Sequence, residues 1–425
     1  MRRLVQTSGP GKQLKGGALF IAIIVSIIVA IILLMFIVIA QFGQLSVSQL
    51  NQNTQLRLNL RSAFEIVQSK YFTEEQNNRW FKNNVNNDSI KITKLNWGAY
   101  NVVVCRTKNN HHILSQAGVF GTFMSADTGL MVSDNGRQVG MSGIIVLKAN
   151  CFLPSGGIKP AFIEGQSYQG SSQNSIFIKK AQASIPMPRS EFIDAVTKQF
   201  DESVWTDSIT SVIPPVLNQP FTGKTVVLNS TTLKLQNINI QNNVKIKCTN
   251  ELEIDSTCVL ENVLIICKKV KFKKGFKGTV HVIATDSIVV DKRCHFKYPS
   301  SFTLLNSVDA NTNLKTINFD ADCKFYGGLL AINNPGKSNA SKVLVKLNQS
   351  SEINGFVYSS DYIHVEGVLN ATLISGSLLL KTPSAVYENH LLGCEINPRK
   401  HASILAIPSI FTNQSKLVCC KKINI

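Results

Sequence analysis

The chain has 425 residues and a formal net charge of +18, from 44 Lys and Arg against 26 Asp and Glu. This length allows two domains or one long repeat structure, and the basic balance suggests anionic partners such as polysaccharide, lipid headgroups or DNA, unless the charges merely solvate the surface. The sequence contains no Walker-type loop, dinucleotide fingerprint, GxSxG or CxxC motif, so it supports no nucleotide-binding, serine-hydrolase or structural zinc site.

The first element is an uncharged apolar stretch, residues 18–40, which we expect to cross a membrane as one helix. Its 23 residues would span about 35 Å as a helix, against about 30 Å of bilayer hydrocarbon. A single helix also satisfies its own backbone hydrogen bonds in lipid. The residues that we assign to this membrane anchor include Ala18, Leu19, Ile24, Ile28, Leu33 and Ile39.

The charges around this stretch predict its orientation. Residues 1–17 are basic and carry no acid, and the next charge after the stretch is Arg57. The positive-inside rule therefore predicts a cytoplasmic flank at 1–17 and places the chain from about residue 41 onward outside an inner membrane, in the periplasm or at the surface. A cleaved signal peptide is the main alternative, although its apolar region is usually about 7–15 residues long; a buried core helix is the other.

Residues 41–72 continue with helical periodicity, because apolar residues recur at spacings of three and four between polar faces rich in Asn and Gln. We predict a stalk helix that packs on a globular head; a short juxtamembrane helix without such packing is the alternative. The apolar positions of this helix are Leu45, Leu56, Leu60, Phe64 and Val67.

Residues 75–190 alternate short apolar runs with turn residues, which predicts a β-rich region. Several prolines then mark residues 186–220 as a linker. Within this linker, the segment from Ser190 to Phe200 resembles a short helix with Ser190 as its N-cap.

Residues 221–390 contain an internal repeat, which predicts a parallel β-helix or related β-solenoid. Three copies start at Val244, Val263 and Val280, with a one-residue gap in the middle copy, and alternate residues should point into a common core. Residues 391–425 lack this period, and we predict that they cap the open end. The expected fold is therefore mainly β, with a transmembrane helix, a stalk helix, a β-rich middle and a C-terminal solenoid.

The ten cysteines allow disulfides in an oxidising compartment, for instance between Cys394 and one of the adjacent Cys419 and Cys420. Four others occupy inward repeat positions, where small core residues are the expected role: Cys248, Cys258, Cys267 and Cys294. Asp320 and Asp322 can share one strand face, where paired carboxylates bind Ca²⁺ or cleave sugars. Without a third acid nearby, we expect no catalytic, metal or cofactor site.

Lysines at outward repeat positions predict a basic stripe across adjacent coils, which can hold an anionic polysaccharide through several charges. A merely solvated outer face is the alternative. We do not expect nucleic acid, because the nearby aromatic residues are better placed in the core. The residues of this predicted stripe are Lys245, Lys247, Lys269, Lys271 and Lys273.

The sequence from Lys15 to Leu19, followed by the apolar helix, resembles the N-terminus of pilin-like proteins, above all minor pilins of type IV pili and related secretion systems. That resemblance covers about residues 12–65 and implies processing after Gly17 and a β-rich head. Pilins typically carry Glu at the fifth position after the processed Gly, whereas this chain has Ala22.

The whole chain is also similar to a group of single-pass envelope proteins of Gram-negative bacteria. The motifs that carry this similarity are Trp97-Gly98-Ala99-Tyr100, Leu153 to Gly157 and Phe296 to Ser300. Together these observations predict a membrane-anchored structural or assembly protein of the envelope, with other envelope or pilus-like proteins as partners. A binding module for anionic polysaccharide is the first alternative, and a carbohydrate-active β-helix enzyme is the second.

Overall fold

The computed structural model describes residues 17–69, 72, 74–82, 88–109, 112–123, 127–170, 177–200, 208–210, 213–306, 314–333, 341–400, 406–411 and 417–423. Strand makes up 57% of the structure, which confirms the mainly β class with one long N-terminal helix. The chain divides into two compact units, Met1–Asn59 and Leu60–Ile425. The predicted basic flank lies outside the described residues except for Gly17.

The first unit contains most of α1 (Gly17–Gln68), a single helix of 52 residues. The mean hydropathy of its apolar 18-residue window is 3.5, and none of that window is buried. By length and composition, α1 is therefore a candidate membrane anchor or signal sequence. It runs unbroken through most of the predicted stalk and ends at Gln68 instead of residue 72. The assigned anchor residues, all within α1 and exposed, are Ala18, Leu19, Ile24, Ile28, Leu33 and Ile39.

The second unit begins with the last turns of α1, which pack on a five-stranded antiparallel sheet. Of the predicted stalk positions, Leu60, Phe64 and Val67 are buried here, and the Phe64 ring stacks on Phe120 at 5.6 Å between centroids. Leu45 is 58% exposed in the other unit. In order, the strands are β1 (Trp80–Lys82), β2 (Ser89–Trp97), β3 (Tyr100–Lys108), β4 (Ile113–Thr122) and β28 (Leu417–Ile423).

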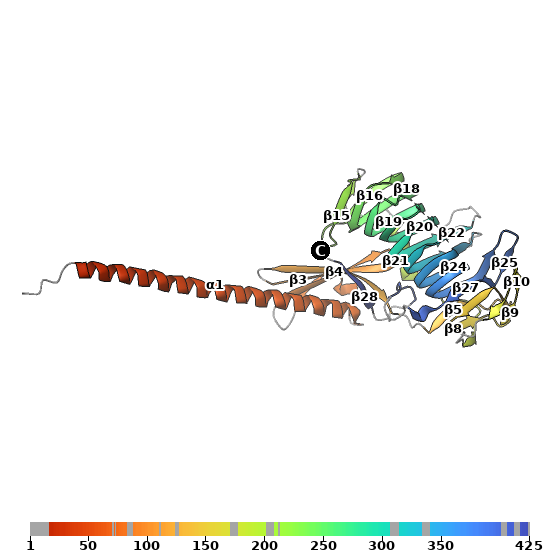
Figure 1. The fold of residues 1–425 in the computed structure, drawn as a ribbon, viewed down its shortest axis with the longest axis horizontal. Coiled ribbons are helices and arrows are strands. Elements are labelled where there is room, and N and C mark those ends of the chain that lie inside the picture. Colours follow the sequence, from red (N-terminus) through yellow and green to blue (C-terminus); the bar gives the residue numbers. More distant parts are fainter. Residues whose placement is uncertain are drawn as a thin grey trace, which may run out of the picture. The chain divides into compact units, whose positions relative to one another are not determined.

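Most of the remaining chain forms one mainly parallel, closed sheet of 18 strands. In Figure 1 its later strands lie side by side from green to blue. Its later strands are β14 (Ser208–Thr210), β15 (Val216–Gln219), β16 (Val226–Leu235), β17 (Asn239–Asn242), β18 (Val244–Ile254), β19 (Val259–Phe272), β20 (Lys277–Val290), β21 (His295–Asn306), β22 (Lys315–Phe319), β23 (Lys324–Asn333), β24 (Val343–Lys381), β25 (Val386–Glu388) and β27 (Cys394–Ile396). Its earlier strands are β5 (Thr128–Val132), β7 (Ile144–Leu147), β8 (Asn150–Leu153), β12 (Gln169–Gly170) and β13 (Ile178–Lys180).

The pairing register confirms the repeat predicted for β18 to β20. Residues of successive copies lie directly opposite each other, and the register shifts between Cys248 and Glu251, opposite the predicted one-residue gap. All the aligned side chains are buried in one core. The confirmed ladders are Ile246/Ile265/Val282, Cys248/Cys267/Ala284, Leu252/Val270/Ile288 and Ile254/Phe272/Val290.

The parallel sheet does not follow chain order at its far end. β24 pairs with β5, and β27 pairs with β7, so strands from the middle of the chain continue the stack after its C-terminal strands. β12 and β13 extend it further by pairing with β7 and β8. The region predicted at 75–190 thus contributes strands to all four sheets among the described residues. The segment predicted as a cap is also divided, because β27 joins the parallel sheet, β28 pairs with β4, and β26 (His390–Leu392) pairs with β6 (Val139–Ser142) in a further sheet.

Both faces of the central parallel strands are buried. Leu264, Ile266 and Ile283 point away from the main core and join a second cluster with Trp97 and Tyr100 of the antiparallel sheet. Strands covered on both faces have nearly continuous apolar sequences, as in residues 263–267 and 280–284. The antiparallel sheet therefore lies between the end of α1 and the outer face of the parallel sheet.

Smaller elements complete the second unit. The predicted linker helix is present as α2 (Ser190–Thr197), but its N-cap is Arg189 with no side-chain cap bond, so the prediction of Ser190 as the cap is wrong. The Arg189 Nη2 atom instead donates to the Ser409 carbonyl at 3.0 Å. The other strands are β6 (Val139–Ser142), β9 (Ile158–Pro160) and β26 (His390–Leu392) in one sheet, and the hairpin of β10 (Phe162–Ile163) and β11 (Gln166–Ser167).

Candidate functional site

The five lysines predicted as one stripe lie in two separate places. Lys245 and Lys247 are opposite Leu264 and Ile266, on the sheet face that the antiparallel sheet covers. Lys247 is only 5% exposed, and its Nζ donates to the Phe200 carbonyl at 3.2 Å. The Nζ of Lys245 lies 5.9 Å from the Trp97 ring centroid, within cation–π range. These two lysines are therefore engaged within the fold.

The other three lysines lie on the following strand segment, and each has an acidic partner. Lys269 and Lys271 are opposite Glu251 and Glu253 in the parallel register. Their charges are thus partly neutralised by acids of neighbouring strands, which leaves little free charge for a polymer. The ion pairs are Lys269 Nζ–Asp286 Oδ2 at 3.5 Å, Lys271 Nζ–Asp291 Oδ2 at 3.9 Å and Lys273 Nζ–Glu253 Oε2 at 3.2 Å.

The two aspartates considered for sugar cleavage lie in the turn between β22 and β23, so they do not share a strand face. Asp320 Oδ1 accepts a hydrogen bond from the Ala321 N–H at 2.8 Å. Asp322 adopts a positive φ of 62°, a conformation that Asp tolerates in turns. Both residues therefore have a turn-forming role.

All ten cysteines are free thiols, so no bond joins Cys394 to Cys419 or Cys420. The four cysteines predicted at inward repeat positions are buried in the main core, as expected. Burial, followed by the neighbouring Cys151, raises the pKa of Cys394 to about 12. Burial, with a smaller contribution from Cys419, also raises the pKa of Cys105 to about 12. Protonated thiols are poor nucleophiles and metal ligands, which suits a packing role.

Two of the sequence motifs meet at the contact between the sheets. Gly98 and Ala99 form the two-residue turn of the β2–β3 hairpin, because Trp97 pairs with Tyr100. Trp97 Nε1 donates to the Asn262 carbonyl at 2.7 Å. The hydroxyls of Tyr100 and Tyr298 both donate to the Ala406 carbonyl, at 3.2 and 3.0 Å. Through these hydrogen bonds, the motifs around Trp97 and Phe296 help to hold the antiparallel sheet against the parallel sheet.

His281 lies at the centre of this contact and is fully buried. Its Nδ1 is 2.9 Å from Ser301 Oγ, while its Nε2 has no hydrogen-bond partner among the described residues. The ring meets Tyr100 edge-on at 5.9 Å between centroids. Burial, with a further contribution from Lys421, lowers the pKa of His281 to about 3. The imidazole is therefore neutral near pH 7, and no pattern in the sequence marked this residue.

Replacing Gly98 with alanine is expected to loosen this contact. The added Cβ would lie 2.7 Å from the His281 Cβ and 2.8 Å from Ser301 Oγ, and φ is +64°. We expect a loss of about 2–3 kcal/mol in the free energy of unfolding, measurable by thermal denaturation of the full chain. Gly136 is the matched control, since its φ is +74° and nothing lies within 4 Å of the added Cβ. Equal losses in the two variants would contradict the close approach.

No protein-family model, curated protein or solved structure matches this chain.

The third motif, Leu153 to Gly157, is a turn held by Asp134. Asp134 Oδ1 accepts hydrogen bonds from the Ser155 N–H and hydroxyl, both at 3.0 Å. Hydrogen bonds from the Ser155 and Gly136 amides lower the pKa of this exposed carboxyl. The turn closes through a bond from the Gly157 N–H to the Pro154 carbonyl at 2.9 Å. This motif therefore shapes a loop.

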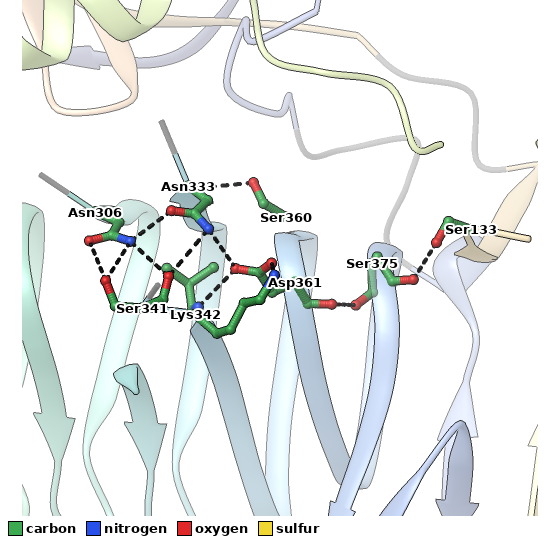
Figure 2. A network of polar contacts seen from close by, with 10 residues as sticks. Ser133, Asn306, Asn333, Ser341, Lys342, Ser360, Asp361 and Ser375 are labelled. Carbon is green, nitrogen blue, oxygen red and sulfur yellow. Dashed lines mark hydrogen bonds and ion pairs between the residues drawn. The ribbon is translucent and has the colours of Figure 1, made fainter. Parts of the chain in front are cut away.

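A polar network follows one corner of the parallel sheet, as Figure 2 shows. Asp361 Oδ2 accepts from Asn333 Nδ2 and the Val343 N–H, both at 3.0 Å, and its Oδ1 lies 3.2 Å from Lys342 Nζ. Asn333 Oδ1 in turn accepts from Asn306 Nδ2 at 2.7 Å. Because these hydrogen bonds join side chains of successive strands, the network stabilises the stacking of strands at this corner.

A pocket of about 540 Å³ lies within the second unit, between the end of α1, the β2–β3 hairpin and α2. Its lining combines Lys94, Arg189 and Glu191 with the rings of Phe72 and Phe192. The volume is in the range of small-molecule sites. No group of three His, Cys, Asp or Glu side chains is placed to hold a metal within the described parts of the chain. The pocket thus has room for a ligand but no recognisable catalytic set.

Proposed function

We propose that this chain is a membrane-anchored structural or assembly protein of a Gram-negative envelope, with α1 in the inner membrane and the second unit in the periplasm or at the surface. The observation that supports this proposal is α1, which is one unbroken helix. Its apolar segment is exposed, and its last turns pack into the core of the antiparallel sheet. An apolar surface of that length needs lipid or protein around it. The orientation rests on the basic residues before the helix.

We also propose that the closed parallel sheet is a β-solenoid. From β18 to β20, neighbouring strands pair in parallel at offsets of 17 to 19 residues, for example Ile246 with Ile265 and Ile265 with Val282. Such a stack grows by nearest-neighbour contacts and produces a long, stiff body. A stiff body on a membrane helix suits a scaffold or a component of a surface or secretion apparatus, and it agrees with the pilin-like N-terminus.

A structural role is further supported by how the polar residues are used. The carboxylates of Asp320, one of the two acids considered for sugar cleavage, and of Asp361 accept hydrogen bonds that shape a turn and a corner of the sheet. The buried thiols Cys248 and Cys267 contribute to a core ladder. These contacts give no support to the second alternative, a carbohydrate-active enzyme that uses Asp320 and Asp322.

Shearing intact expressing cells, followed by mass spectrometry of the N-terminus in each fraction, tests the proposal. A chain starting at Ala18 in the sheared fraction would support a pilin-like component. A chain that stays in the inner membrane and starts near Met1 would support a static anchored protein. A soluble periplasmic chain starting near residue 41 would contradict the anchor, because α1 would then be a cleaved signal.

A further inference from the structure

The tight turns between successive strands form a column along one corner of the parallel sheet. The Gly275 N–H donates to the Lys292 carbonyl at 3.0 Å, and the Arg293 N–H donates to the Ala321 carbonyl at 3.2 Å. The first outward residues after these turns also lie in register, since Lys277 pairs with His295 and His295 with Lys324. Side chains from neighbouring turns are therefore about 4.8 Å apart along the stack.

This corner carries a group of cations that we call the turn patch: Lys274, Lys277, Lys292, Arg293 and His295. The four Lys and Arg residues are exposed, and His295 is half-buried. Within the described residues, no salt bridge joins any of these four to an acid. This distinguishes the patch from Lys269, Lys271 and Lys273, which all have acidic partners.

Several lysines lie close to His295. Partial burial of His295, followed by the charges of Lys324, Lys277 and Lys297, lowers the pKa of this residue. Acidic residues also lie in this column of turns: Asp291 precedes Lys292, and Asp320 and Asp322 lie in the next turn, beyond which Lys324 pairs with Glu352 at 3.6 Å. An anion along the turns would therefore depend on Lys274, Lys277, Lys292 and Arg293, the cations that have no salt-bridge partner among the described residues.

We propose that the turn patch binds an acidic polysaccharide, with its carboxylates along the column of turns. Charges repeated at strand spacing suit a linear polymer that carries one anionic group per short repeat. Single-stranded nucleic acid usually requires exposed rings for base stacking. The aromatic ring beside His295 is Tyr326, which is half-buried and tilted against it at 5.9 Å, while Phe276 and Phe296 are in the core.

The test uses the detergent-solubilised full chain and immobilised polygalacturonate, with neutral dextran, duplex DNA and anionic phospholipid vesicles as further probes. The patch variant combines Lys274→Glu, Lys292→Glu and Arg293→Glu. The matched control combines Lys179→Glu, Lys224→Glu and Lys234→Glu, three exposed lysines elsewhere that give the same change in net charge. Thermal denaturation checks that both variants stay folded.

We expect polygalacturonate to bind in a salt-sensitive manner, at least about tenfold more weakly to the patch variant, and within about twofold of the original affinity to the control. Absence of binding, or equal weakening in both variants, would overturn the proposal. Equal or tighter binding of DNA or vesicles through the same three residues would overturn the assignment to polysaccharide. The inference does not depend on the membrane topology proposed above, because the assay uses solubilised protein.

Discussion

Truncating Phe302 to alanine is expected to lower the free energy of unfolding by about 3–5 kcal/mol, because it removes a large buried ring from a close-packed cluster. Phe302 is fully buried, and its ring lies 4.9 Å from Phe296 and 5.0 Å from Phe325. It also stacks on Phe272 at 5.5 Å and on Phe319 at 5.8 Å. The ring thus links strands β19, β21, β22 and β23, and a cavity there would weaken several strand contacts at once.

Urea denaturation of the solubilised chain, followed by near-ultraviolet circular dichroism, measures this effect. Phe162→Ala is the matched control, since it deletes the same ring at a position that is 73% exposed. We expect the control to change stability by no more than about 0.5 kcal/mol. Comparable shifts of the two midpoints would mean that the aromatic cluster does not contribute as its packing indicates.

Acidification is expected to destabilise the contact between the two sheets through His281. Its folded-state pKa is about 3 against an ordinary value of 6.5, so the unfolded chain binds a proton at higher pH than the folded chain. The contribution of neutral His281 to the free energy of unfolding is therefore fully present above pH 6.5 and is lost as the pH falls toward 3. The full loss is about 4–5 kcal/mol, of which about 2–3 kcal/mol would appear by pH 4.5.

Denaturation midpoints between pH 7 and pH 4.5 provide the measurement, since most carboxylates are still ionised in that range. The His281→Asn variant can retain the hydrogen bond to Ser301 but cannot take up the proton, so its midpoint should depend less on pH. His390→Gln is the control, because His390 is half-buried at another site and hydrogen-bonds to the Glu388 carbonyl. An unchanged pH slope in His281→Asn would show that another group controls the acid response.

Local patterns in the sequence determined the elements that depend on near neighbours. The apolar run of residues 18–40 and the period that follows it predicted one long helix, and α1 extends from Gly17 to Gln68. The alternation around Val244, Val263 and Val280 predicted the parallel ladders, including the one-residue gap. Both predictions succeed because helical and strand periodicities depend on residues a few positions apart, and because the copies of a repeat can be aligned with one another.

The tertiary structure alone decided how distant segments combine. The pairing of Leu373 with Leu130, and of Cys419 with Phe120, joins residues hundreds of positions apart and leaves no local signal. The same reason explains why the five lysines were wrongly predicted to form one continuous basic stripe. Outward alternation correctly placed Lys245 and Lys269 away from the main core, but only the position of the antiparallel sheet and of acids on neighbouring strands determined which charges are covered, paired or free.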